Sequence, residues 1–139
     1  MLTFDAGSRE ICMVRRIRTN IPLQALVTMN DPVYVEASGA LARAVLCAEL
    51  GLDEVGLDRR RIAYAFRRVL VRPPTEPETD RLVAVLADAL ADFKSNPQAA
   101  TELLSAARVD ASGLRDELVA AWIIVANVLF NLDETLMRT

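Results

Sequence analysis

Residues 118–130 read LVAAWIIVANVLF, and this stretch decides the fold. Asn127 is its only polar residue, so a helix formed here has apolar side chains on every side. A helix without a polar face has to be surrounded by other parts of the protein. We therefore expect a last helix, from about Leu114 to Leu136, to be the central element of the fold. Its apolar run is too short to span a bilayer, and we expect no membrane insertion.

Start signals for further helices recur along the rest of the chain. Asp31 is a good N-cap, and Pro32 after it is tolerated at the first helical position because its missing N–H needs no partner there. Thr75 and Glu78 match the capping box, in which each side chain bonds to the other residue's backbone. Similar signals are Asn20, Asp58 and Asn96 as N-caps, and Gly51 and Pro73 as stops. We expect six helices, at residues 22–29, 32–50, 59–72, 76–94, 97–107 and 114–136.

The composition agrees with an all-α fold. Hydrophobic residues make up 53% of the 139 residues, aromatic residues only 5%, and there are five glycines, a balance that favours packed helices. A chain of this length fits one domain with a core of its own. Residues 1–20 show no helical or strand periodicity. We expect a single helical domain over 1–139, with an irregular, extended arm at 1–20 and about six helices at 21–139 packed around a buried C-terminal helix.

Charge and titratable residues exclude several classes of function. Net charge is −3, and although residues 1–72 carry a small excess of arginine, neither half is basic enough for a nucleic-acid partner. The run Arg59-Arg60-Arg61 lacks interleaved aromatic residues and is expected to be a solvated helix face. Histidine is absent, which removes the commonest general base and metal ligand, and we expect no catalytic and no metal site. Cys12 and Cys47 form no metal or haem motif and are expected to be buried thiols; the alternative, if the chain is exported, is a disulfide.

Two groups of polar residues are candidate binding sites. Arginines of the arm could form an anion site, because guanidinium groups bind carboxylates or sulfates in a bidentate manner. The alternative is that these arginines pair with Asp5, Glu10, Asp31 and Glu36 within the chain. Asn127 and Asn131 share one side of the last helix, and as buried amides they should hold a loop or the arm by hydrogen bonds. The candidate binding residues are Arg9, Arg15, Arg16, Arg18, Asn20, Asn127 and Asn131.

Several longer motifs resemble a known family. They are MLTFDAGSRE at 1–10, RTNIPLQAL at 18–26, MNDP at 29–32, AFRRVL at 65–70 and NLDET at 131–135. Together they are similar to the C-terminal domain of unknown function of large planctomycete proteins, which often also carry a planctomycete-type cytochrome c domain. The resemblance implies that several hundred residues precede this region and that Met1 is an internal methionine. It also implies export to the cell envelope, with haem on upstream domains and no cofactor on this chain.

From these observations we expect a non-catalytic structural or interaction module that caps a multidomain envelope protein. Its partners would be the upstream domains of the same polypeptide. The alternative is part of an enzyme or binder that acts on acidic or sulfated polysaccharide through the arginines of the arm. Apolar residues in the arm, among them Ile11, Val14 and Ile17, lead us to expect that the isolated chain forms a homodimer or otherwise self-associates.

Overall fold

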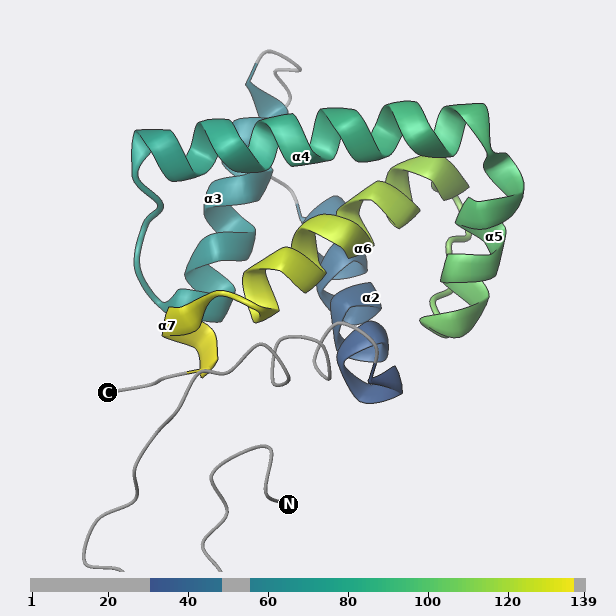
Figure 1. Ribbon diagram of the computed structural model, residues 1–139, viewed down its shortest axis with the longest axis horizontal. Helices are drawn as coiled ribbons and strands as arrows, with labels where there is room; N and C mark the ends of the chain where they lie inside the picture. The colour runs from purple at the N-terminus through teal and green to yellow at the C-terminus, as the bar shows by residue number, and fades with distance from the viewer. Residues whose placement is uncertain (1–30, 49–55, 137–139) are drawn as a thin grey trace, which may run out of the picture.

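A computed structural model describes residues 31–48 and 56–136, and these residues form a bundle of α-helices (Figure 1). Helices account for 79% of the described residues, and none of those residues lies in a strand, so the expected all-α class is confirmed. No helix within these two ranges is long and apolar enough to cross a membrane. The helices are α2 (Pro32–Leu46), α3 (Leu57–Leu70), α4 (Glu76–Ser95), α5 (Pro97–Ala106), α6 (Asp116–Phe130) and α7 (Asp133–Leu136).

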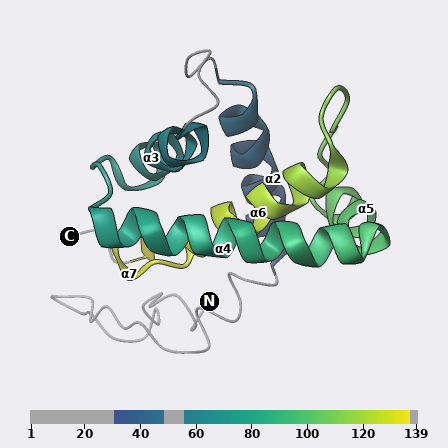
Figure 2. The ribbon, with the colours of Figure 1, turned by 90° about the horizontal axis from the view of Figure 1, so that it is seen from above.

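The apolar helix α6 is the centre of the bundle, as its sequence predicts. It packs most extensively against α2, and next against α4 and α5. Figure 1 shows it crossing the middle of the molecule below α4, and Figure 2 shows α2 and α3 together on one side of α4. Trp122 is the largest fully buried side chain, at 1% exposure. One side of α6 differs from the expectation, because Ile124, Asn127 and Val128 are only half-buried among the described residues.

The helix starts follow the predicted caps closely. Asp31 is the N-cap of α2, and its carboxylate accepts a hydrogen bond from the Val33 N–H at 2.8 Å. At the start of α4 the capping box forms, with the Glu78 carboxylate accepting from the backbone N–H of Thr75 at 2.7 Å. Asn96 caps α5 through the Ala99 N–H. These local contacts are formed between residues two or three apart, which is why the sequence alone could predict them.

Three predicted boundaries are wrong. Helix α2 ends at Leu46, before Gly51, and α3 starts after Gly56, whose positive φ of 74° a glycine adopts readily, so Asp58 lies inside the first turn. The predicted last helix is divided into α6 and α7. At the break, the carbonyl of Leu129 accepts from the Leu132 N–H at 3.3 Å and from the Thr135 hydroxyl at 2.8 Å, whereas in a continuous helix it would accept from the Asp133 N–H. The predicted helix at 22–29, the arm at 1–20 and Gly51 itself lie outside the described residues.

Two expectations about exposure also change. Cys47 follows α2 as its C-cap and is exposed, not buried, while Cys12 lies outside the described residues. The arginine run at 59–61 is not uniformly solvated, because only 17% of the Arg61 side chain is exposed. Arg59 remains exposed and contacts Glu76 and Asp80 of α4. This face of α3 therefore contributes to packing between helices as well as to the surface.

Candidate functional site

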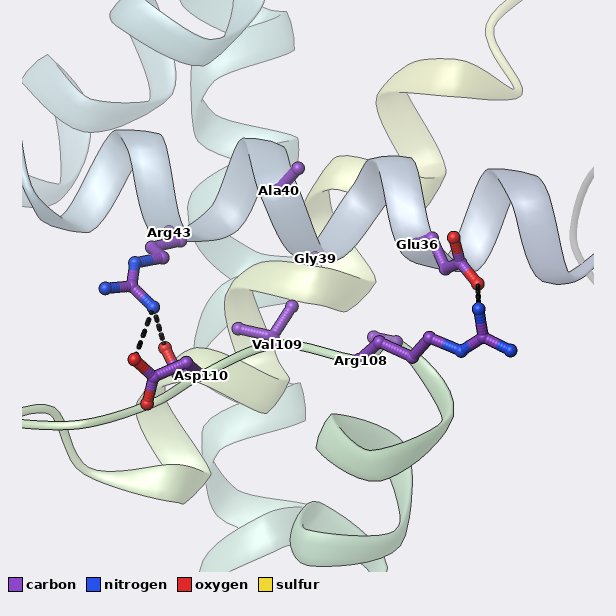
Figure 3. Close-up of a pocket in the computed structure, with 8 residues that line it drawn as sticks. Glu36, Gly39, Ala40, Arg43, Arg108, Val109 and Asp110 are labelled. Atoms are coloured by element: carbon purple, nitrogen blue, oxygen red, sulfur yellow. Dashed lines mark hydrogen bonds and ion pairs between the residues drawn. The ribbon is translucent and has the colours of Figure 1, made fainter.

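A pocket of about 370 Å³ lies between α2 and the segment that connects α5 to α6 (Figure 3). We did not predict this pocket from the sequence, because its two walls are about 70 residues apart in the chain. In Figure 3 the side chain of Val109 reaches toward Gly39 in the middle of α2, and one arginine stands toward each end. The residues that line the pocket are Glu36, Gly39, Ala40, Arg43, Ala107, Arg108, Val109 and Asp110.

Both arginines of this pocket are paired with carboxylates of the opposite wall. Arg43 donates to the backbone carbonyl of Asp110 and lies 3.1 Å from its carboxylate. Arg108 lies 3.1 Å from the carboxylate of Glu36. Hydrogen bonds from Ser112, together with the contact with Arg43, lower the pKa of Asp110 to about 2. The carboxylate of Asp110 is therefore charged at neutral pH, and the two ion pairs tie the connecting segment to α2.

Gly39 allows the two walls to come together. A Cβ atom at this position would lie 2.2 Å from Cγ2 of Val109, which is closer than real carbon atoms approach, and 3.0 Å from Cβ of Ala107, which is a tight contact. A side chain at position 39 would therefore push the connecting segment away from α2. A glycine inside a predicted helix is a recognised sign of close packing, and this was the one signal in the sequence that pointed to the pocket.

A second cluster of charges surrounds Arg72 between α3 and α4. Its guanidinium group donates to Glu78 at 2.7 and 3.0 Å and to Glu134 of α7 at 2.9 and 3.0 Å. The same group lies over the ring of Phe66, 4.8 Å from the ring centroid. The bonds from Arg72 and from the Thr75 N–H lower the pKa of Glu78 to about 2, and the two carboxylates raise the pKa of Arg72. This cluster joins α3, α4 and α7.

The two clusters share one chemical property. In each, the arginines are bonded to carboxylates of the same chain, so neither cluster offers an unpaired arginine to a ligand. Among the described residues there is no group of three or more cysteine, aspartate or glutamate side chains that could hold a metal ion. What the clusters do is connect helices that are distant in the sequence.

The residues predicted from the sequence are placed only in part. Arg9, Arg15, Arg16, Arg18 and Asn20 lie outside the described residues, so the anion site of the arm and the polysaccharide alternative stay predictions. Two of the acids expected to neutralise the arginines of the arm have other bonds. They are Asp31, which caps α2, and Glu36, which pairs with Arg108.

Asn127 and Asn131 are brought together as their spacing predicts. The side-chain amide of Asn131 donates to the side-chain oxygen of Asn127 at 2.8 Å and to its backbone carbonyl at 2.9 Å. Both side chains are half-buried at the C-terminal end of α6. The bond between them satisfies part of their hydrogen-bonding capacity, and a binding role for the pair stays a prediction.

Trp122 lies in the core, with 1% of its surface exposed. Among the described residues the buried Nε1 atom has no hydrogen-bond partner. An unpaired buried N–H is costly, so the large apolar ring of Trp122 must compensate through its packing.

Comparison with known proteins gives one family. Residues 1–86, which are more than half of the chain, match the family described as PSD1, protein of unknown function (DUF1553). No curated protein and no solved structure matches the chain. The motifs at 1–10, 18–26, 29–32 and 65–70 fall inside the matched range, whereas the motif at 131–135 falls beyond it. The chain therefore belongs to the PSD1 (DUF1553) family of proteins of unknown function.

Proposed function

We propose that this domain is a non-catalytic packing module that caps a multidomain protein of the cell envelope. One observation supports the proposal most strongly: in two of its pockets the arginines are bonded to carboxylates across the fold. In one pocket the ion pairs are those of Arg43 with Asp110 and of Arg108 with Glu36. In another, Arg72 pairs with both Glu78 and Glu134. Groups placed to bind or transform a ligand are usually left available to it, whereas these connect helices.

The setting of the module is part of the same proposal. Its support is the resemblance of the motifs at 1–10, 18–26 and 29–32 to the C-terminal region of large planctomycete proteins. In that setting the upstream domains of the same polypeptide are its partners, and any haem belongs to those domains.

Thermal unfolding with added ligand distinguishes the proposed packing module from the alternative, a domain that binds acidic sugars. A ligand that binds only the folded state increases the free energy of unfolding, by about 2.7 kcal/mol when its concentration is a hundred times its Kd. The melting temperature rises as a result. We expect sulfated and uronic-acid oligosaccharides to leave the melting temperature of the 139-residue chain unchanged at physiological salt.

A matched pair of variants shows where any binding occurs. Arg43→Ala removes an arginine of the pocket in Figure 3, and Arg67→Ala removes an exposed arginine of α3 that does not line it. A rise in melting temperature that Arg43→Ala abolishes and Arg67→Ala preserves would overturn the packing module in favour of a ligand site at this pocket. A rise that both variants preserve would also contradict the proposal, and would point to a site elsewhere on the chain.

A further inference from the structure

An apolar groove runs along the side of α6 that the described residues leave half-covered. It consists of two adjoining hollows of about 380 and 360 Å³, which share the half-buried side chain of Val85. One hollow continues to Phe93 and Ile124, and the other to Val128 and Leu132. We call this the α4–α6 groove. Its apolar lining residues are Phe66, Leu82, Val85, Ala89, Phe93, Ile124, Val128 and Leu132.

The sequence of α6 predicts that protein covers this groove. The helix is apolar on every side apart from Asn127, and such a helix needs protein around it. Its other sides are buried against α2, α4 and α5. The groove is therefore where the packing of α6 is incomplete among the described residues, and the missing cover must present apolar side chains.

The groove also carries negative charge, which a basic occupant would neutralise. Asp88 and Asp92 of α4 line it, are exposed, and have no ion-pair partner among the described residues. This separates them from Glu78, which also borders the groove but is bonded to Arg72. A segment that covers the groove and neutralises these carboxylates needs basic residues interleaved with apolar ones.

Residues 11–18 of this chain have that pattern, ICMVRRIR. Four of the eight residues are large and apolar, namely Ile11, Met13, Val14 and Ile17, and three are the arginines Arg15, Arg16 and Arg18. Two of the acids that the sequence offers as partners for these arginines have other partners in the structure. Asp31 accepts from the Val33 N–H, and Glu36 pairs with Arg108. Among the described residues, Asp88 and Asp92 are acids that line an open apolar surface and have no ion-pair partner.

Chain length and direction allow the arm to reach the groove. Helix α2 begins at Pro32, and its Tyr34 packs edge-on against Phe130 at the C-terminal end of α6, with ring centroids 6.5 Å apart. The 12 residues between Arg18 and Asp31 span at most about 40 Å, whereas the whole of α6 is only about 22 Å long. The arm can therefore run from the end of α6 along the full groove.

We propose that residues 11–18 of the arm dock in the α4–α6 groove of the same chain, with apolar side chains on its floor and arginines at Asp88 and Asp92. A tether of this length gives an effective concentration of the order of millimolar, which far exceeds that of a second copy in dilute solution. Docking in this manner would cover the apolar residues that led us to expect self-association.

Disulfide trapping tests the proposal in the full chain, because Cys12 lies within the docking segment. With Cys47→Ser in the background, Val85→Cys puts a thiol in the groove. Ala87→Cys is the matched control, since it lies two residues along α4 on an exposed position outside the groove lining. We expect the bond between Cys12 and position 85 to form at least about tenfold faster than the bond to position 87, because docking holds one thiol near Cys12 and not the other.

Two further measurements separate the possible occupants of the groove. Asp88→Asn with Asp92→Asn should slow the trapping at position 85 several-fold, and so should about 0.5 M salt, because screening weakens exposed ion pairs. If Val85→Cys lowers the melting temperature, Arg81→Cys at the exposed edge of the groove replaces it. Equal rates at positions 85 and 87 would overturn the proposal. A covalent dimer that forms on a non-reducing gel with Val85→Cys, but not with Cys47→Ser alone, would also overturn it and would assign the groove to a second copy.

Discussion

Replacing Gly39 by alanine tests whether the contact between α2 and the segment after α5 is as close as the structure shows. Inside a helix, alanine is more favourable than glycine by about 1 kcal/mol, so on helix propensity alone this change would stabilise the protein. The packing argues the opposite. The new Cβ would lie 2.2 Å from Cγ2 of Val109, 3.0 Å from Cβ of Ala107 and 3.3 Å from the Ala107 carbonyl oxygen.

The neighbours of Gly39 cannot easily move away. Val109 is branched at Cβ, so few rotamers are open to it. Ala107 is buried, with 2% exposure, and its backbone carbonyl oxygen would itself contact the new Cβ atom. Ion pairs of Arg43 with Asp110 and of Arg108 with Glu36 hold the same segment on both sides. Overpacking a close contact costs about 1–3 kcal/mol, and the shortest of these distances indicates the upper part of that range.

The net expectation is that Gly39→Ala lowers the free energy of unfolding by about 1–2 kcal/mol, after the gain in helix propensity is subtracted. Urea unfolding followed by circular dichroism at 222 nm measures this change. Val109→Ala removes the clashing methyl groups, so Gly39→Ala should cost much less in the Val109→Ala background than in the unchanged protein, with a coupling of about 1 kcal/mol or more. If Gly39→Ala proves as stable as the unchanged protein, the reasoning is wrong.

Three further predictions concern the core, the Arg72 cluster and one strained residue. Trp122→Ala should lower the free energy of unfolding by about 3–5 kcal/mol, because it empties the largest buried site next to α2, α4 and α5; a thermal midpoint that hardly moves would show that α6 is not central. Folding lowers the pKa of Glu78 from 4.5 to about 2, so its contribution is complete above about pH 4.5 and is lost as the pH falls toward 2. Glu78→Gln should therefore flatten the acid side of the stability profile measured by urea unfolding, and an unchanged acid slope would contradict this reasoning. Val71 ends α3 with a φ of 63° and is 80% exposed, so Val71→Gly should raise the free energy of unfolding by about 1 kcal/mol, as measured by urea unfolding; a loss of stability would mean that its side chain makes a contact that matters.

Local signals allowed much of the fold to be predicted from the sequence. The caps at Asp31, Thr75 and Asn96 involve residues two or three apart, so the physics that starts each helix is complete within a few residues. The burial of Trp122 followed from an apolar run too long to be left in water. The spacing of four residues also placed Asn127 and Asn131 on one side of the helix, but their hydrogen bond to each other was not predicted.

Where the sequence misled, a distant or side-chain interaction was responsible. The long final helix was predicted from its apolar pattern, but it is divided into α6 and α7, and at the break the Thr135 hydroxyl donates to the Leu129 carbonyl. The arginine run of α3 was expected to be solvated, but Arg61 is largely buried and Arg59 reaches across to Glu76 and Asp80 of α4. Such contacts depend on which helices become neighbours.

The sequence by itself determined the class of the fold, most of the helix starts and the identity of the central helix, because each depends on periodicity and on bonds between residues close in the chain. Only the tertiary structure decided which charges meet. The partners Arg43 and Asp110 are 67 residues apart, and Arg72 and Glu134 are 62 apart, so no local pattern could pair them. The same holds for the α4–α6 groove, because a surface left open on an apolar helix exists only after its neighbours have taken their places.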